Sequence, residues 1–153
     1  MKNIDCNETY APVTCYGTIW TLLALVPRHQ WHIYQMDAKV AFLNSDLSEE
    51  IYMKTPSGSN TYDGFVWQLN YTLYGLKQAS QEWYKKIHIE LESLGFTWSM
   101  SNHGVFKNNN RTLVIIAVYV NDFLIFSSKL NTIQHTKSEL SSCFDIKDLG
   151  DTK

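Results

Sequence analysis

The feature that most constrains the fold is a pair of apolar runs joined by two polar residues. The first run is VIIAVYV, residues 114–120, and the second is FLIF, residues 123–126, with Asn121 and Asp122 between them. Apolar runs rich in β-branched and aromatic residues are typical of buried strands, and a connection of two turn-forming residues is typical of a β-hairpin. We therefore expect an antiparallel hairpin here, within a sheet that buries it.

Alternating apolar and polar residues predict further strands. We expect strands at residues 31–37, 51–54 and 65–69, and GVFKNNNRTLVIIAVYV, residues 104–120, reads as strand, Asn-rich turn and strand. The strand at 31–37 ends at Asp37. Because several of these strands follow one another through short turns, an antiparallel sheet is favoured over an alternating parallel one.

Three apolar stripes at helical spacing predict helices. The first covers residues 18–26 and is expected to stop at Pro27, and the second covers residues 79–94, where Gly95 supplies the stop. The third covers residues 132–143, with Asn131 as its N-cap and Gln134 closing a capping box. Together with the strands, these helices predict an α+β fold, an antiparallel sheet with helices packed on one face.

Composition excludes several classes of protein. The chain of 153 residues is 44% hydrophobic, enough for one globular domain with a core. No apolar run approaches the roughly 20 residues of a membrane-spanning helix, and the N-terminus lacks the core of a signal peptide, so we expect an intracellular protein without a membrane partner. The scattered cysteines Cys6, Cys15 and Cys143 argue against a disulfide framework and structural zinc. The formal net charge of −2 gives no electrostatic reason for tight nucleic-acid binding by this segment alone.

Two carboxylates stand at strand ends and are candidates for a metal site. Asp37 follows one strand, and Asp122 lies in the tight connection of the hairpin. If the strands are neighbours, the carboxylates come close together and repel one another unless divalent cations lie between them, and such oxygen ligands suit Mg²⁺. A pair of metals can clamp the attacking and leaving oxygens of a phosphoryl transfer. Because Asp and Asn are common turn formers, a purely structural turn remains the alternative.

Five segments carry a resemblance to a known family. ETYAPV, QMDAKVAFLN, LYGLKQAS, VYVND and FDIKDLG occur in this order over nearly the whole chain. In order and approximate spacing they resemble the reverse transcriptase (RNA-dependent DNA polymerase) domain of the Pol polyproteins of copia-type LTR retrotransposons. The resemblance implies a single partial domain over residues 1–153, made of the polymerase palm and the adjacent fingers segment, with the thumb and RNase H absent.

The resemblance assigns a role to five positions. Asp37 matches the first metal-binding aspartate and Asp122 the last aspartate of the Y-V-D-D turn, so that both would hold Mg²⁺. Phe42 matches the aromatic residue beneath the deoxyribose, although a core aromatic is an equal reading of this position. Gln78 resembles the glutamine that contacts the incoming nucleotide. Lys147 matches a lysine near the triphosphate, and an ordinary solvated lysine is the alternative.

Asn121 departs from the family pattern, which has an aspartate at this position. The amide keeps the shape of the side chain and loses the charge that would bind the metals, so we expect catalysis to be absent or nearly so. Other departures point the same way. Ser45 replaces a glycine, which matters if the position needs a positive φ, and Ser80 and Gln81 replace a proline and an arginine. Pro27 falls in a helix that continues in relatives.

Three hypotheses follow for function. The first is an inactive reverse transcriptase fragment by descent, whose family partners are an RNA/DNA primer-template and a dNTP. The second is a palm that still adds nucleotides when another polypeptide completes it. The third is a nucleic-acid or protein interaction module that catalyses no reaction. Against it, Lys85 and Lys86 are isolated and form no surface of alternating basic and aromatic residues of the kind that binds RNA. The sequence leaves the oligomeric state open.

Overall fold

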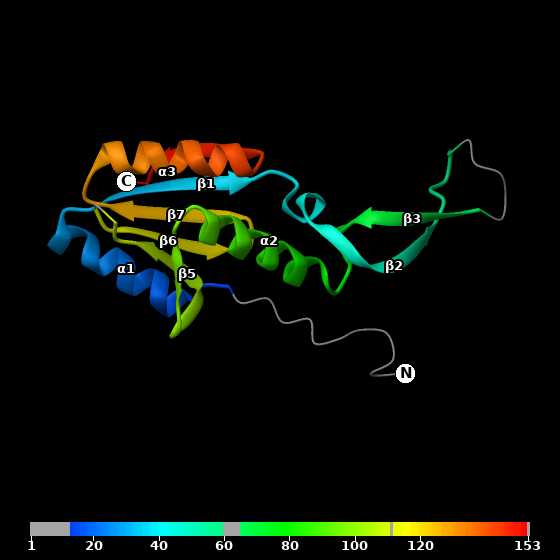
Figure 1. Ribbon diagram of the computed structural model, residues 1–153, viewed down its shortest axis with the longest axis horizontal. Coiled ribbons are helices and arrows are strands. Elements are labelled where there is room, and N and C mark those ends of the chain that lie inside the picture. The colour runs from blue at the N-terminus through cyan, green and yellow to red at the C-terminus, as the bar shows by residue number, and fades with distance from the viewer. Residues whose placement is uncertain (1–12, 60–64, 111, 153) are drawn as a thin grey trace.

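The computed structural model describes residues 13–59, 65–110 and 112–152. Within these residues it has three α-helices, one 3₁₀ helix and eight strands (Figure 1). In chain order they are α1 (Tyr16–His29), β1 (His32–Ala38), η1 (Ala41–Asn44), β2 (Asp46–Lys54), β3 (Val66–Tyr71), α2 (Ala79–Ser93), β4 (Thr97–Ser99), β5 (Asn102–Asn108), β6 (Val114–Tyr119), β7 (Asp122–Ser127), α3 (Leu130–Cys143) and β8 (Ile146–Asp151). None of the helices described is long and apolar enough to cross a membrane.

Six strands form the main sheet, in the order β4-β5-β6-β7-β1-β8. Each neighbouring pair is antiparallel, so the expected α+β class with an antiparallel sheet is confirmed. The hairpin expected from the two apolar runs is β6 and β7, in which Val114 pairs with Ser127 and Tyr119 with Asp122. β1 lies between β7 and β8, whose residues follow it much later in the chain.

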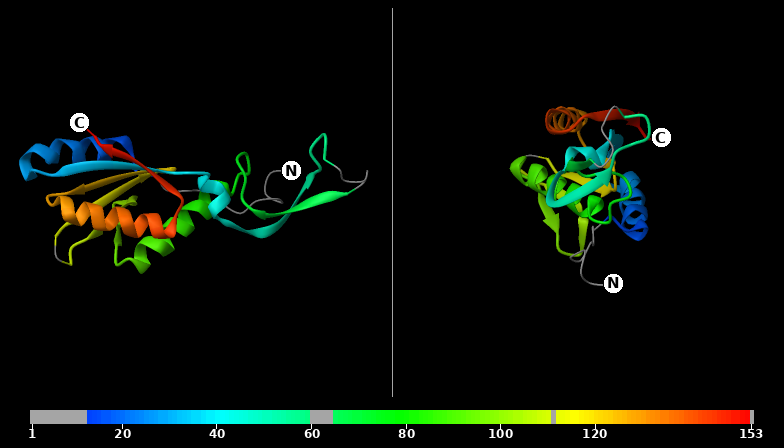
Figure 2. Two further views of the ribbon diagram at one scale, coloured as in Figure 1. Left: turned by 90° about the horizontal axis from the view of Figure 1, so that it is seen from above. Right: turned by 90° about the vertical axis from the view of Figure 1, so that its right-hand side faces the viewer.

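Helices cover both faces of the sheet rather than one. α2 and α3 share one face, where Trp83, Ile87 and Leu140 join the larger core cluster. α1 lies on the other face, where Leu22 packs with Ile33 of β1 in a second cluster. The left panel of Figure 2 shows α1 on one side of the strands and the other two helices opposite. The expectation of helices on one face therefore holds for α2 and α3 and is wrong for α1.

Two helix ends differ from the sequence prediction. Pro27 does not stop α1, which continues to His29, because proline removes only one backbone donor and the N–H groups of Gln30 and Trp31 still donate to the Val26 carbonyl. α3 begins at Leu130 rather than after Asn131, which was expected as its N-cap.

The residue before α3 is Lys129, which has an extended backbone and no side-chain capping bond. The backbone N–H groups of Thr132 and Ile133 both donate to the Lys129 carbonyl. Asn131 thus lies inside the first turn, and the capping box expected with Gln134 is also wrong.

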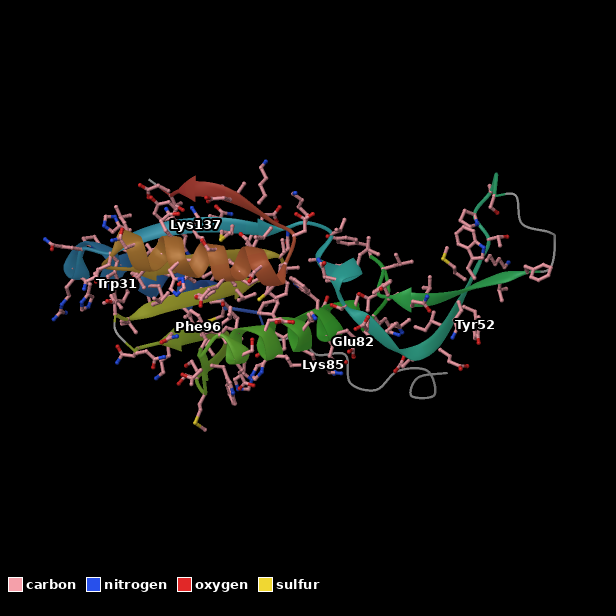
Figure 3. All side chains as sticks on the ribbon, turned by 45° about the horizontal axis from the view of Figure 1, so that its top comes forward. Trp31, Tyr52, Glu82, Lys85, Phe96 and Lys137 are labelled. Carbon is pink, nitrogen blue, oxygen red and sulfur yellow. The ribbon has the colours of Figure 1, made fainter. Side chains whose placement is uncertain are left out.

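β2 and β3 form a separate two-stranded sheet that projects from the body of the molecule (Figure 1). Ile51 pairs with Leu69 and Met53 with Trp67, so apolar side chains share one face of this hairpin. Tyr52 is 53% exposed and lies far from the labelled core residue Phe96 in Figure 3. Unlike the main sheet, this hairpin buries none of the large side chains of the core.

Candidate active site

Asp37 and Asp122 lie directly opposite each other in the sheet. They are register partners in the antiparallel pair β1 and β7, and direct partners point to the same face with Cβ atoms about 4.5–5.5 Å apart. On the other side of β1, Lys147 is the partner of Asp37, and Tyr119 of β6 is the partner of Asp122. The condition set in the sequence analysis, that the two strands are neighbours in the sheet, is met by this register.

This row of four side chains lies on the face of the sheet that α1 partly covers. Side chains alternate between the two faces of a strand, so Ile33, four residues before Asp37, points to the same face as Asp37. Ile33 packs in the cluster under α1. Lys147 is exposed, whereas Asp37 and Asp122 are half-buried. The candidate residues expected on an open sheet face therefore lie beside the N-terminal end of α1.

The turn between β6 and β7 consists of Val120 and Asn121. Val120 has a φ of 58°, whereas Asn121 has no positive φ, as in a type II′ turn. A β-branched residue rarely adopts this conformation, so the turn is held by its surroundings. The Trp83 indole N–H donates to the Val120 carbonyl at 2.7 Å, and the Ala38 N–H donates to the Asn121 carbonyl at 2.9 Å.

Each carboxylate accepts a hydrogen bond from an amide side chain. Asn121 Nδ2 donates to Asp37 Oδ1, and Gln35 Nε2 donates to Asp122 Oδ1 at 2.9 Å. Sequence reasoning did not identify Gln35 as part of the site. The signal was its spacing, because a residue two positions before Asp37 in a strand points to the same face.

Tyr16 of α1 adds an aromatic side chain next to the row. Its hydroxyl donates to the Tyr119 hydroxyl at 3.1 Å, and the ring centroids are 5.3 Å apart. This hydrogen bond, together with charge repulsion between the two phenols, raises the pKa of Tyr119. No sequence pattern indicated this contact, since the two tyrosines are 103 positions apart.

Phe42 and Gln78 lie beyond the end of β1, where the chain enters the projecting hairpin. Phe42 belongs to η1, is 8% exposed, and contacts the Tyr74 ring edge-on with centroids 4.5 Å apart. Gln78 precedes the first turn of α2 and donates from Nε2 to Glu49 Oε2 at 2.9 Å. No hydrogen bond or ring contact described for either residue reaches the two aspartates. Sheet register and hydrogen bonds therefore bring together Asp37, Asn121, Asp122 and Lys147, whereas the described contacts of Phe42 and Gln78 are with other residues.

Ser45, at the end of η1, does not need the conformation of a glycine. Its φ is −108°, in the extended region, so the condition under which its replacement of glycine would strain the backbone is not met. The side chain is 2% exposed, and its hydroxyl has no hydrogen-bond partner among the residues that the structure describes.

The donor set can be tested against the Mg²⁺ expected from the sequence. Mg²⁺ takes oxygen ligands, and the position at which the resemblance implies a third carboxylate presents the NH₂ group of Asn121 to Asp37. Within residues 13–59, 65–110 and 112–152 no group of three or more His, Cys, Asp or Glu side chains could hold a metal ion. As placed, these side chains do not fit a pair of Mg²⁺ ions.

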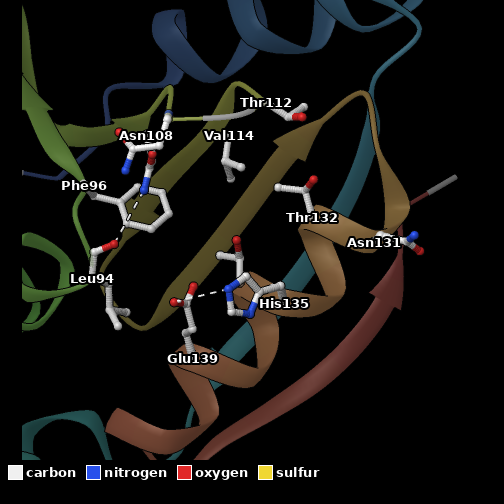
Figure 4. Close-up of a pocket in the computed structure, with 11 residues that line it drawn as sticks. Leu94, Phe96, Asn108, Thr112, Val114, Asn131, Thr132, His135 and Glu139 are labelled. Carbon is white, nitrogen blue, oxygen red and sulfur yellow. Dashed lines mark hydrogen bonds and ion pairs between the residues drawn. The ribbon is translucent and has the colours of Figure 1, made fainter.

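Two cavities lie elsewhere on the molecule. One of about 470 Å³ opens between α3 and the strands of the main sheet, and it is lined by side chains that include Phe96, Asn108, His135 and Glu139 (Figure 4). None of the six residues expected at the site lines it. A second, of about 510 Å³, borders α3 and β8 and includes Lys137.

Comparison with known proteins identifies the family. The family described as reverse transcriptase (RNA-dependent DNA polymerase) matches residues 1–153. The chain is 39% identical to the retrovirus-related Pol polyprotein from transposon TNT 1-94 of Nicotiana tabacum, over 97% of this chain and 12% of that protein. It is 34% identical to the Pol polyprotein from transposon RE2 of Arabidopsis thaliana, over 97% of this chain and 10% of that protein.

A shorter relative also matches. The putative transposon Ty5-1 protein of Saccharomyces cerevisiae is 37% identical over 75% of this chain and 38% of that protein. No solved structure matches this chain. The chain spans about a tenth of the length of the two plant polyproteins. With a family match over all of its residues, this chain belongs to the reverse transcriptases of retrotransposon Pol polyproteins.

Proposed function

We propose that this chain is a segment of a retrotransposon reverse transcriptase that does not catalyse DNA synthesis. The observation that carries the proposal is the hydrogen bond from Asn121 Nδ2 to Asp37 Oδ1. Reverse transcriptases generally use divalent metal ions, whereas here a neutral amide occupies the position next to the carboxylate. The bond gives the Asp37 carboxylate a partner that is not a cation. It also points the NH₂ group of Asn121, a hydrogen-bond donor, toward Asp37, where a metal ion would need an oxygen ligand.

The size of the effect follows from electrostatics. Two unit charges 4 Å apart attract by about 4 kcal/mol at an effective dielectric constant of 20, and a neutral amide oxygen recovers only part of this. Each 1.36 kcal/mol added to a barrier slows a reaction about tenfold. Replacing one carboxylate by an amide is therefore sufficient to slow nucleotide addition by orders of magnitude.

The family also suggests roles for the remaining residues, and these belong to the same proposal. The six-stranded sheet would be the palm and β2–β3 part of the fingers, with a primer-template and a dNTP as the ancestral partners. Lys147, exposed opposite Asp37, is available to a triphosphate. Phe42 is mostly buried against Tyr74, and Gln78 is engaged by Glu49, so a contact with nucleotide requires both to rearrange.

The test is Mg²⁺-dependent primer extension on an RNA template. The matching segment of an active relative's polymerase is replaced by this chain, either unaltered or carrying Asn121→Asp. We expect extension only from the Asn121→Asp version. Asn70→Asp, which adds the same charge at an exposed position of β3, is the matched control and should leave the polymerase silent. Extension by the unaltered chain would show that the proposal is wrong.

A second candidate function is nucleic-acid binding without chemistry. The structure places Tyr16 and Trp20, which are 64% and 68% exposed, one helical turn apart on α1, with Tyr16 against Tyr119. Exposed aromatic side chains are platforms on which unpaired bases stack. Salt-sensitive retention of single-stranded RNA that is weakened by Trp20→Ala would support this function, and no retention at low salt would exclude it.

A further inference from the structure

The two aspartates are held by amides that cross between strands. Asp37 and Asp122 face each other on β1 and β7, and like charges directly opposite in an antiparallel pair destabilise it. Asn121, in the turn just before β7, donates to Asp37 on β1, whereas Gln35 on β1 donates to Asp122 on β7. Each carboxylate is therefore bonded by a residue from outside its own strand.

Gln35 is placed for this bond by the register of the sheet. Its own partner on β7 is Leu124, so Asp122 is its diagonal neighbour on the same face, within reach of a long side chain. The contact from Nε2 to Oδ1 is 2.9 Å, and both residues are half-buried. A carboxylate accepts hydrogen bonds at both oxygens, so this bond fixes Oδ1 and leaves Oδ2 available to another partner.

We propose that Gln35 is a positioning residue for Asp122. Its amide fixes the orientation of the carboxylate, both in the chain as it stands and in a version whose metal-binding set is restored. Hydrogen-bonding partners of ligating carboxylates typically contribute about 10–100-fold to metal affinity. The part of this inference that concerns metal affinity rests on the proposed function, because it uses Asn121→Asp to restore the third carboxylate.

The first experiment measures Mn²⁺ affinity of the full chain from the electron paramagnetic resonance signal of the free ion. The Asn121→Asp chain is compared with its double variants carrying Gln35→Met, which keeps the length of the side chain and removes the donor, or Gln68→Met, the same change at an exposed position of β3. We expect Gln35→Met to weaken Mn²⁺ binding at least about tenfold and Gln68→Met to leave it unchanged. Circular dichroism verifies that each variant is folded.

The outcomes separate the two proposals. Equal Mn²⁺ affinity with and without Gln35→Met overturns the role of Gln35 and leaves the proposed function standing. If the unaltered chain binds Mn²⁺ as tightly as Asn121→Asp, the electrostatic argument for the proposed function fails, and Gln35→Met in the unaltered chain then decides the role of Gln35 by the same tenfold criterion. If Gln35→Met does not fold, Gln35→Asn, which moves the amide one methylene away from Asp122, replaces it.

A second experiment tests the role of Gln35 without any metal, and it applies if the Asn121→Asp chain binds no Mn²⁺. Urea unfolding of Gln35→Met, Asp122→Ala and the double variant forms a mutant cycle in the otherwise unaltered chain. We expect Gln35→Met to raise the unfolding equilibrium constant about tenfold more when Asp122 is present than when it is absent. Additive effects of the two changes would overturn the proposal.

Discussion

The indole N–H of Trp83 donates to the backbone carbonyl of Val120 at 2.7 Å, which ties α2 to the turn that carries Asn121 and Asp122. Trp83 is 2% exposed and also contacts the Phe144 ring. The turn has a positive φ at Val120, so it depends on bonds from its surroundings. A residue of the hydrophobic core thus also holds the backbone of the candidate site.

Trp83→Phe should destabilise the fold by about 1–3 kcal/mol, because it leaves the Val120 carbonyl without its donor and removes buried volume. Urea unfolding measures the change. Trp20→Phe is the control, since Trp20 is 68% exposed and its replacement should alter stability by no more than about 0.5 kcal/mol. Equal effects of the two substitutions on stability would contradict the role of Trp83 in holding the turn at Val120.

Gly104→Ala and Gly17→Ala should change stability in opposite directions. A Cβ at Gly104 would lie 2.7 Å from Thr14 Oγ1 and still closer to the Thr14 backbone N, so we expect a loss of about 1–3 kcal/mol. A Cβ at Gly17, in the first turn of α1, meets nothing within 4 Å, and the lower entropy of the unfolded chain should stabilise the protein by about 0.5–1 kcal/mol. Thermal unfolding of both variants tests the pair.

Ser45→Ala should stabilise the protein by about 1 kcal/mol, because it removes a buried hydroxyl that has no partner among the described residues. Ser128→Ala changes an exposed serine and should be close to neutral. A lower denaturation midpoint for Ser45→Ala than for the unaltered chain would show that the hydroxyl is bonded in solution.

Asp148 should contribute to the loss of stability in acid. Burial opposes its ionisation, but the hydrogen bond from Lys137, the Gly150 N–H and the charge of Lys137 outweigh burial and lower the pKa of Asp148 below its ordinary value of 3.8. The folded protein then binds fewer protons than the unfolded chain, so this contribution is present above that value and is lost as the pH falls through the folded pKa.

Urea midpoints measured from neutral pH down to about pH 2 test this, since carboxylates titrate in that range. Asp148→Asn should show a shallower acid dependence than the unaltered chain, whereas the two should differ little in slope near neutral pH. Glu50→Gln, at an exposed position of β2, is the control and should keep the full acid dependence. An unchanged acid slope in Asp148→Asn would refute the role of the Lys137 pair.

Local patterns predicted the elements whose signals are strong. The stripe over residues 79–94 matches α2, and Gly95 has the φ of 82° that a helix stop requires. The β6–β7 hairpin was also expected from its apolar runs. By contrast, β4 and β8 were not expected. β8 is a largely exposed edge strand of sequence IKDLGD, and backbone hydrogen bonds to β1 hold it in place. Such a strand carries little hydrophobic pattern by which it could be predicted.

The arrangement in space was less accessible from the sequence. β6 is buried on both faces, since Ile116, Ala117 and Val118 are all buried. This agrees with α1 covering the face opposite α2 and α3. The sequence signal for burial on both faces was the continuous apolar run. The pairing of Asp37 with Asp122 was expected only if their strands were neighbours. Gln35 carried no motif, and its bond to Asp122 depends on a register between residues 87 positions apart.

The position of β1 between β7 and β8 also sets the order in which the molecule can assemble. Both of its partners are synthesised much later, since Gln35 reaches Asp122 across 87 residues and the Lys39 side chain reaches Asp145 across 106. Contacts this distant close slowly, because the entropy of the intervening loop is lost before they form. During translation β1 therefore emerges with both edges unpaired, and a chaperone or a neighbouring nascent chain can bind it before its own partners exist.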